Sequence, residues 1–397
     1  MKKNVLFIVA LIGLAGCAKQ VTTSSLANYD ENKAKALGVP AGNKLSSAMI
    51  RAINWPERDN SWFVEFDELQ PLKGDLAYEK GVVRRDPSAI IKVDSLYYVW
   101  YSKSYGPTQG FAGDLEKDKV FPWDRCDLWY ATSVDGWTWK EQGIAVARGE
   151  KGAYDDRSVF TPEVMAWKGK YYLYYQTVKS PYSVRVIEEI AVASSDSPRG
   201  PWVKSEKPIV SPSFNTGEWK GTADDRFSVN TKGDFDSHKT HDPCVIPYKG
   251  KFYLYYKGER MGEEITFAGR EIKHGVAISD NPTGPFVKSE YNPISNSGHE
   301  VCVWPYNGGI ASLITTDSFE RNTIQWAPDG INFEIMAAIT GAPHAIGLNR
   351  TADNEKDPTE ILRWGLTHKY VTYDYQCIMR FSSFRKTSHA AKGEKTR

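Results

Sequence analysis

Four carboxylates recur at comparable places in this chain of 397 residues. They stand before apolar, strand-like runs, in Arg84-Arg85-Asp86-Pro87-Ser88, Thr161-Pro162-Glu163-Val164, His241-Asp242-Pro243-Cys244 and His299-Glu300-Val301-Cys302. A lone acid usually caps a turn or pairs with arginine, but like charges brought close together cost free energy and push their pKa values apart. Four acids at one repeat position are therefore typical of a functional site.

Paired carboxyl groups can hydrolyse a glycosidic bond, because one protonates the leaving oxygen while the other activates water. A third acid can tune and orient the proton donor. The sequence contains no G-x-S-x-G, P-loop, G-x-G-x-x-G or H-E-x-x-H pattern. The acids therefore favour a glycoside hydrolase over other enzyme classes.

The charge balance excludes some partners. Lys+Arg is 50 and Asp+Glu is 49, so the formal net charge is +1 and gives no bulk attraction to nucleic acid or to an anionic membrane. The aromatic fraction of 13%, with 22 Tyr and 13 Trp, fits a β-rich fold and also carbohydrate binding.

A repeated unit must position these acids. A turn followed by an aromatic strand occurs in residues 93–101, 167–175, 248–256 and 306–314, and residues 195–202 match residues 279–286. Each unit reads as four strands in roughly 60–80 residues, which is the pattern of a propeller blade. The remaining segments, 55–83 and 361–384, can form a fifth blade that joins the two chain ends and removes the sheet edges.

We therefore predict an all-β fold, a five-bladed β-propeller over residues 55–385, which is the catalytic domain. A pair of β-sandwiches is the alternative, although it does not require this repeat. In a propeller the innermost strands begin around one end of the channel, so the four acids, with His241 and His299, are expected in one cavity. Proline after an acid suits a strand start, because it fixes the backbone and donates no ladder hydrogen bond.

The N-terminus is typical of an exported lipoprotein. Lys2-Lys3 precede an apolar run at residues 5–12, which is shorter than the roughly 20 residues of a membrane span. Leu14-Ala15-Gly16-Cys17 then resembles the bacterial lipobox. We expect residues 1–16 to be a signal peptide, Cys17 to be lipidated and residues 17–25 to be a tether. The protein would be periplasmic or anchored to the outer membrane; a plain secretory signal is the alternative.

Residues 26–54 differ from the rest and predict a helical arm, broken at residues 38–42. The arm is too small to hold its own core, so it must pack on the main body or on a second subunit. Residues 386–397 are expected to be a disordered tail. The later cysteines, Cys126, Cys244, Cys302 and Cys377, have no zinc-site spacing and are expected to be mostly buried free thiols, although the sequence leaves three disulfide pairings open.

The chain resembles glycoside hydrolase family 117, the α-neoagaro-oligosaccharide hydrolases or 3,6-anhydro-α-L-galactosidases. The acid-containing stretches carry the resemblance, most specifically His241-Asp242, His299-Glu300 and the helical arm. The resemblance implies an exo-acting, inverting enzyme that releases 3,6-anhydro-L-galactose from the non-reducing end of neoagaro-oligosaccharides by cutting an α-1,3 bond. It also implies a homodimer with swapped arms. Some members bind a divalent metal ion, but this sequence has no ligand set that requires a cofactor.

The resemblance assigns Asp86 as the general base and Asp242 as the acid that tunes and positions the donor. It implies His299 as the general acid, whereas related five-bladed families use a Glu at the position of Glu300. The sequence does not separate the two donors. Candidate substrate-binding residues are Thr161, Glu163, His241, Trp123, Arg125 and Gln176.

Two other functions compete with this one. A five-bladed arabinosidase or xylosidase would use the same acids, Asp86, Asp242 and Glu300. A non-catalytic glycan-binding lipoprotein would have lost one of these three, and all three are present.

Overall fold

The computed structural model describes residues 30–53, 60–222, 225–353 and 356–385. The predicted signal peptide, Cys17 lipidation site, tether and C-terminal tail lie outside these residues. The chain divides into two units, residues 1–57 and 58–397. Among the helices of the described residues, none has the length and apolar character needed to cross a membrane.

The described residues of the first unit form two short helices, α1 (Glu31–Ala36) and α2 (Ser47–Ile53). Helix α1 begins after Asp30, whose carboxylate accepts hydrogen bonds from the backbone N–H of Asn32 at 2.9 Å and of Lys33 at 3.1 Å. Gly38 and Gly42, with φ of 77° and 79°, break the chain between the helices. The function of this segment as a dimerisation arm stays a prediction.

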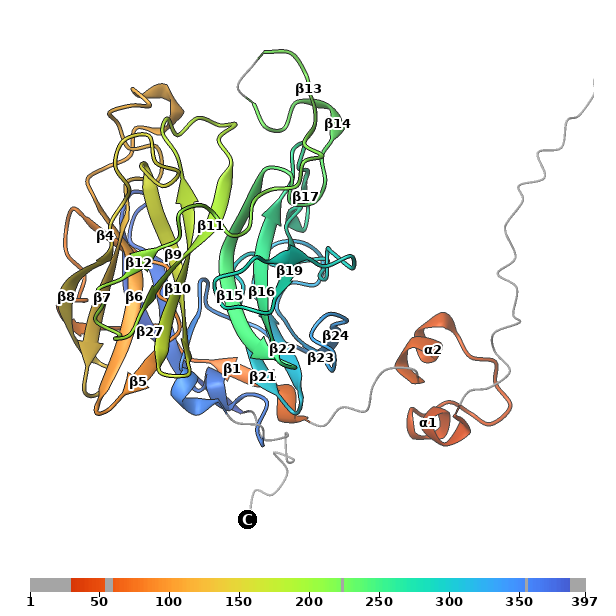
Figure 1. Ribbon diagram of the computed structural model, residues 1–397. Coiled ribbons are helices and arrows are strands. Elements are labelled where there is room, and N and C mark those ends of the chain that lie inside the picture. The colour runs from red at the N-terminus through yellow and green to blue at the C-terminus, as the bar shows by residue number, and fades with distance from the viewer. Residues whose placement is uncertain (1–29, 54–59, 223–224, 354–355, 386–397) are drawn as a thin grey trace, which may run out of the picture. The chain divides into compact units, whose positions relative to one another are not determined.

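The second unit is mostly β (Figure 1). Its strands group into five largely antiparallel blades, and one parallel pair, Glu188 with Lys239, links the second blade to the third. The first blade comprises β4 (Val82–Arg85), β5 (Ile91–Val93), β6 (Leu96–Tyr105), β7 (Asp127–Ser133) and β8 (Thr138–Val146), with β3 (Lys73–Gly74) at its edge. The second comprises β9 (Ser158–Trp167), β10 (Lys170–Val178), β11 (Glu188–Ser195) and β12 (Val203–Lys204). The third comprises β15 (Lys239–Tyr248), β16 (Lys251–Glu259), β19 (Lys273–Ser279) and β20 (Val287–Lys288).

The fourth blade comprises β21 (Val303–Tyr306), β22 (Gly309–Ile314), β23 (Thr323–Ala327) and β24 (Glu334–Ala338). The fifth comprises β25 (Gly347–Leu348), β26 (Trp364–Tyr370), β27 (Gln376–Arg385), β1 (Val64–Phe66) and β2 (Gln70–Pro71). Two small hairpins, β13 (Gly217–Trp219) with β14 (Val229–Lys232) and β17 (Ile265–Thr266) with β18 (Gly269–Arg270), extend from the third blade's connections. Short 3₁₀ helices lie at Asn60–Trp62, Gly110–Ala112, Arg350–Ala352 and Glu360–Leu362.

The predicted hairpins are confirmed, and their turns explain the repeat. In the second, third and fourth blades both central turn residues have positive φ, at Lys168-Gly169, Lys249-Gly250 and Asn307-Gly308. This is the type I′ geometry, whose twist matches that of paired strands. The recurring Gly follows from this backbone requirement.

The fifth blade joins the two ends of the propeller, as predicted. Strand β1 pairs antiparallel with β27, with Val64 opposite Arg385 and Phe66 opposite Ser383. The rest of the segment predicted for this blade divides differently, because β3 pairs with β8 and β4 with β6 in the first blade.

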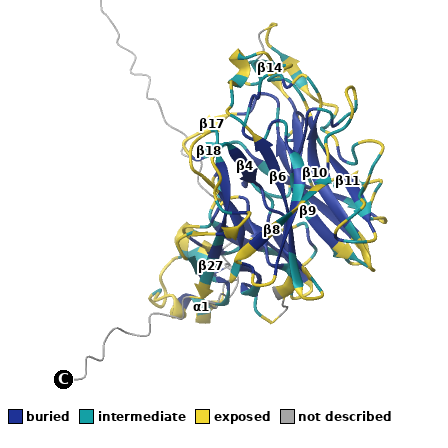
Figure 2. Cartoon of the chain, turned by 90° about the vertical axis from the view of Figure 1, so that its left-hand side faces the viewer, coloured by how far each residue is buried: buried dark blue, intermediate teal, exposed yellow. Residues whose placement is uncertain are grey.

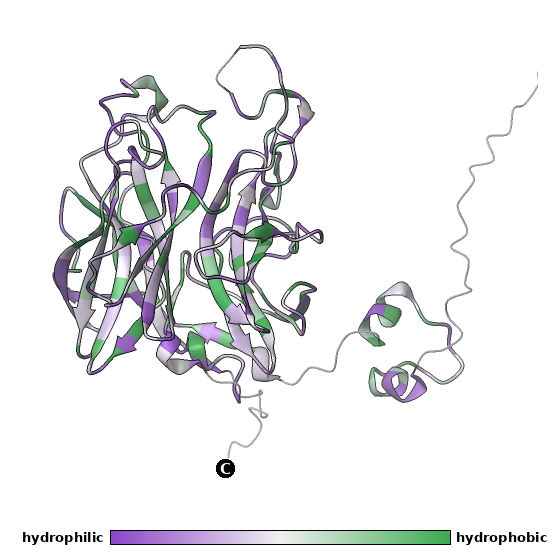
Figure 3. Cartoon of the chain, viewed as in Figure 1, coloured by the Kyte–Doolittle hydropathy of each residue, from purple (hydrophilic) through white to green (hydrophobic). Residues whose placement is uncertain are grey.

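The core lies between neighbouring blades. Large side chains such as Trp100, Leu173 and Tyr175 are buried between the first and second blades. Figure 2 shows that buried residues follow the strands while exposed ones gather in the loops, and Figure 3 shows hydrophobic and hydrophilic residues interspersed along the strands. The four cysteines within the described residues are buried and free, as the sequence predicted.

Candidate active site

The innermost strands carry the acids at an irregular position. Asp86, Thr161, Asp242 and Ala345 have φ of 49°, 47°, 51° and 45°, a left-handed conformation that non-glycine residues rarely adopt. The pairing of β9 with β10 and of β15 with β16 shifts register here, so each strand contains a bulge. Such strained positions are typical of functional sites.

Two sequence expectations need correction. Asp242 and Glu163 do not precede their strands, because they lie inside β15 and β9. Glu300 does precede β21, and Asp86 lies between β4 and β5. The second blade has Thr161 at the position of Asp86 and Asp242, and Glu163 follows two residues later. The expected ring of four equivalent carboxylates is therefore wrong at the second blade, where a threonine occupies the equivalent backbone position.

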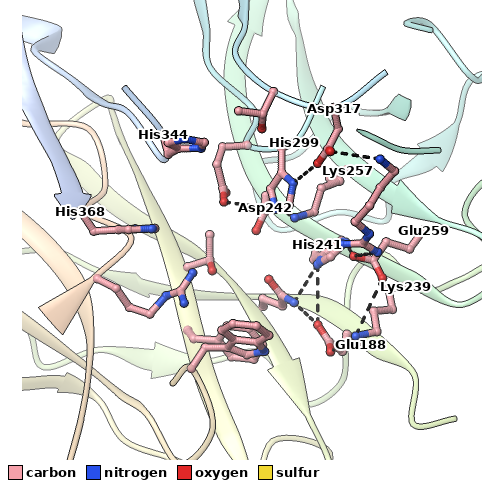
Figure 4. A pocket seen from close by; sticks show the side chains of 18 of the residues that line it. Glu188, Lys239, His241, Asp242, Lys257, Glu259, His299, Asp317, His344 and His368 are labelled. Carbon is pink, nitrogen blue, oxygen red and sulfur yellow. Dashed lines mark hydrogen bonds and ion pairs between the residues drawn. The ribbon is translucent and has the colours of Figure 1, made fainter. Parts of the chain in front are cut away.

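A cavity of about 470 Å³ opens at this end of the channel (Figure 4). Figure 4 shows His344 and His368 on one side and His299, Lys257 and His241 on the other. The lining residues are Arg85, Trp123, Phe160, Thr161, Gln176, Glu188, Lys239, His241, Asp242, Lys257, Glu259, Arg270, His299, Glu300, Thr316, Asp317, His344, His368 and Tyr370.

Asp86 is held by two cationic or basic neighbours. The Arg85 guanidinium donates through Nε to Oδ2 at 2.6 Å and through Nη2 to Oδ1 at 3.0 Å, and Nδ1 of His368 lies 3.1 Å from Oδ1. Burial raises the pKa of Asp86, but Arg85 and His368 outweigh it and hold this pKa well below its usual range. Asp86 is therefore an ionised carboxylate.

Asp242 and Glu300 have opposite protonation states. Burial raises the pKa of Asp242, but its ion pair with Lys257 and the nearby His241 bring this pKa below the usual value. Burial raises the pKa of Glu300 well above its usual value, and the charge of Asp242 raises it further, although Lys257 opposes both effects. Glu300 therefore keeps its proton to a higher pH than Asp242 does.

His299 forms a pair with Asp317. Its Nδ1 lies 2.6 Å from Oδ2 of Asp317, and its Nε2 lies 3.7 Å from Oε1 of Glu300. A carboxylate acceptor places the ring proton on Nδ1 and leaves the lone pair on Nε2. Burial and Lys257 lower the pKa of His299 to about 4, although Asp317 opposes them. The ring is therefore neutral near pH 7.

A buried polar wall faces this group. Lys239 Nζ lies 2.5 Å from Oε1 of Glu188, and Gln176 Nε2 lies 2.9 Å from Nδ1 of His241. Nε2 of His241 lies 3.3 Å from Oε1 of Glu259. Because the charged side chains are paired, this wall presents directed hydrogen-bonding groups rather than one sign of charge.

The predicted substrate-binding residues lie in different places. Thr161, Gln176, His241 and Trp123 line the large cavity. Trp123 stacks on Phe121 at 4.5 Å between ring centroids, Arg85 lies 4.8 Å from its ring, and its N–H donates to Tyr182 at 2.9 Å. The stacking contacts of Trp123 are therefore made inside the protein.

The other two candidates lie outside the large cavity. Glu163 accepts a hydrogen bond from the backbone N–H of Ala89 at 2.7 Å and lies 3.5 Å from Arg350. It lines a smaller cavity instead. Arg125 lines neither cavity and donates to the carbonyl of Glu116 at 2.6 Å.

Sequence reasoning missed several lining residues, among them Lys257, Asp317, His344 and His368. A signal for Lys257 existed, because it directly follows the aromatic strand repeat, just as Gln176 does in the second blade. The other three lie in loops or in the fifth blade, where the repeat is not visible.

The metal ion that the resemblance implies has no suitable ligand set. Within the residues that the structure describes, no group of three or more His, Cys, Asp or Glu is arranged to hold a metal ion. The cavity's carboxylates are instead engaged by cations or by histidine, as Asp86 is by Arg85 and Asp242 by Lys257. The residues present do not fit a divalent ion.

At one end of the propeller channel, Glu300 has a raised pKa and Asp86 and Asp242 have lowered ones. A carboxyl group that holds its proton, close to carboxylates that have lost theirs, defines a site of the glycoside hydrolase class. The chain is similar to Zg3597, a family 117 glycoside hydrolase produced by the marine bacterium Zobellia galactanivorans, with 36% identity and a TM-score of 0.66. That match covers 82% of this chain and 92% of the other. The chain therefore belongs to glycoside hydrolase family 117.

A more distant solved structure shares the fold alone. It is described as a glycoside hydrolase and has 12% identity and a TM-score of 0.55, with coverage of 89% of this chain and 100% of the other. No protein-family model matches the chain, and no curated protein matches it. The family assignment therefore depends on the similarity to Zg3597.

Proposed function

We propose that the protein is an exo-acting, inverting glycoside hydrolase that releases 3,6-anhydro-L-galactose from the non-reducing end of neoagaro-oligosaccharides by cutting the α-1,3 bond. The observation that carries the chemistry is the pairing of an ionised Asp86 with a protonated Glu300 at one end of the channel. Family membership suggests the substrate class.

In this mechanism Asp86 takes one proton from a water molecule, whose oxygen forms a bond to the anomeric carbon. The bond from that carbon to the leaving galactose oxygen breaks, and the donor gives its proton to that oxygen. Asp242 stays ionised beside the donor and supports its protonated state. Gln176 and His241 are proposed to hydrogen-bond the sugar.

Glu300 is the donor that the electrostatics favour, although the family resemblance implies His299. The pKa of Glu300 is raised, whereas that of His299 is lowered to about 4. A donor must carry its proton at the working pH. We therefore propose that Glu300 delivers the proton and that His299, fixed by Asp317, orients Glu300 or the substrate.

The direct test is incubation of the protein with neoagarobiose, followed by detection of free 3,6-anhydro-L-galactose and galactose. We expect release by the wild type and loss of about 10³-fold or more in Asp86→Asn, because the base is removed. A folded wild type that releases neither sugar would refute the agar substrate, and arabinosides, xylosides and carrageenan-derived oligosaccharides would be assayed next.

The two donors are separated by changing the leaving group. Glu300→Gln should lose activity on neoagarobiose but keep it on 4-nitrophenyl 3,6-anhydro-α-L-galactopyranoside, because nitrophenolate leaves without a proton. His299→Gln should lose activity on both substrates to a similar degree. The reverse pattern would assign the donor to His299.

Two further proposals concern assembly and location. We propose a homodimer formed through residues 26–54, which light scattering of the full chain and of a chain beginning at residue 58 would test.

We also propose export as a lipoprotein attached at Cys17, which labelling with a fatty-acid analogue and a Cys17→Ser control would test.

A further inference from the structure

A second, much smaller cavity adjoins the large one. Its volume is about 30 Å³, and Thr161, Asp242 and Glu300 line both cavities. One dipeptide from each of the five blades encloses it: Asp86-Pro87, Thr161-Pro162, Asp242-Pro243, Glu300-Val301 and Ala345-Ile346. The strained backbone positions of the innermost strands therefore meet around this one small space.

The volume of this cavity limits which molecule can bind in it. About 10–15 Å³ of such volume is enough for one water molecule, and a water needs two to four polar partners. A sugar ring does not fit. The walls supply the ionised carboxylate of Asp86 and the Thr161 hydroxyl, whose Oγ1 lies 3.4 Å from Oδ2 of Asp86. The prolines donate no backbone N–H and hold the ring of dipeptides rigid.

We propose that this small cavity is the binding site of the hydrolytic water, which Asp86 and Thr161 hold and which attacks the anomeric carbon from the channel side. The inference rests on the proposed function and deepens it, because it locates the nucleophile. Asp86 accepts the water's proton as the oxygen bonds to carbon, and the galactose oxygen leaves with the proton of the donor. Thr161 is then a positioning residue.

A third cavity lies close to the small one. Its volume is about 330 Å³, Arg350, Val164 and Val245 line it, and Arg350 pairs at 3.5 Å with Glu163, which lines the small cavity. The small cavity therefore lies between the large cavity and this ion pair. When a sugar occupies the large cavity, the proposed water is already in place.

The first test is independent of activity. A crystal structure of the unliganded wild type at atomic resolution should show one ordered water in the small cavity, within about 3.2 Å of Asp86 and Thr161. The same water should persist in Glu300→Gln soaked with neoagarobiose. A dry small cavity, or a water that contacts Asp86 only from the large cavity, would overturn the inference even if the enzyme proves active.

The second test fills the cavity. Val301→Ile adds one methylene to its wall and should lower kcat about tenfold or more while KM stays within about twofold. Val245→Ile makes the same change on the neighbouring blade, in the cavity of about 330 Å³, and should keep both constants within about twofold.

Thr161→Val keeps the shape of the side chain and removes its hydroxyl, so kcat should fall. Thr161→Ser keeps the hydroxyl, so its kcat should stay close to that of the wild type.

An equal loss in Val301→Ile and Val245→Ile, or a rise in KM alone, would contradict the inference. If the wild type releases no sugar at all, the proposed function fails, and the crystal structure still decides where the water binds.

Discussion

A single guanidinium group sets the charge of the proposed base. Arg85 contacts both oxygens of Asp86, and its Nη1 donates to Oε1 of Gln376 at 3.3 Å. The Trp123 ring lies on the same guanidinium. Trp123 thus packs on the arginine that pairs with Asp86 and also lines the large cavity, and its contact with a sugar stays a prediction.

Removal of Arg85 should shift the pH profile in a defined direction. Arg85 lowers the pKa of Asp86, so Arg85→Met should raise it, and the base will be protonated at a higher pH. The acidic limb of kcat/KM should therefore move up by about one pH unit or more. Arg84→Met is the matched control, because Arg84 pairs with Glu79 and Glu141 instead. An acidic limb that stays in place in Arg85→Met would refute the role.

The sequence predicted the acids better than their partners. Asp86, Asp242 and Glu300 were found because residue type and repeat position coincide. Lys257 and Asp317 act through charge and hydrogen bonds that exist only after folding, since Asp317 reaches His299 from the loop after β22. Whether Glu300 or His299 holds the proton depends on burial, which the sequence does not contain.

At the scale of the element, three of the innermost strands combine a residue in the left-handed conformation with a proline directly after it. A left-handed residue followed by proline reads as a strand start, which is why the acids were expected before the strands. Hydrogen bonds on both sides of the bulge keep β15 continuous, with His241 opposite Lys257 and Cys244 opposite Tyr255. The repeat therefore predicted the blades correctly, while the bulge within each strand became visible only through the register.

The type I′ turns give a prediction about stability. Gly250 has a φ of 78°, and a Cβ at this position meets open space, so only the backbone conformation opposes a side chain. Gly250→Ala should lower the free energy of unfolding by about 1 kcal/mol, because the left-handed conformation is unfavourable for alanine. Gly250→Asn should cost less, since Asn tolerates this conformation. Urea denaturation measures both, and equal stability of Gly250→Ala and the wild type would contradict the turn assignment.

At the scale of the whole molecule, closure of the propeller depends on a short N-terminal strand. Trp62 and Val64 are buried, 7% and 1% exposed, in the core of the fourth and fifth blades. A chain that begins at residue 72 lacks them and leaves β27 unpaired on one side. It should lose several kcal/mol of stability, about 3–5 kcal/mol for the tryptophan alone, and aggregate through the exposed edge.

The matched control for this truncation begins at residue 60 and keeps β1. Thermal unfolding with light scattering compares the two chains. A chain beginning at residue 72 that unfolds at the same temperature as the control would show that closure does not depend on β1.

The same closure makes the site one of the last parts of the fold to be complete. Asp86 lies near the start of the propeller, but His368 and Gln376, which contact Asp86 and Arg85, belong to the fifth blade. The base therefore lacks these neighbours until β26 and β27 have folded, and β1 stays unpaired until β27 is in place. A chain interrupted before the fifth blade would contain the acids of the site but neither its final wall nor the strand pairing that closes the propeller. Loss of the proposed activity would thus report a propeller that has failed to close.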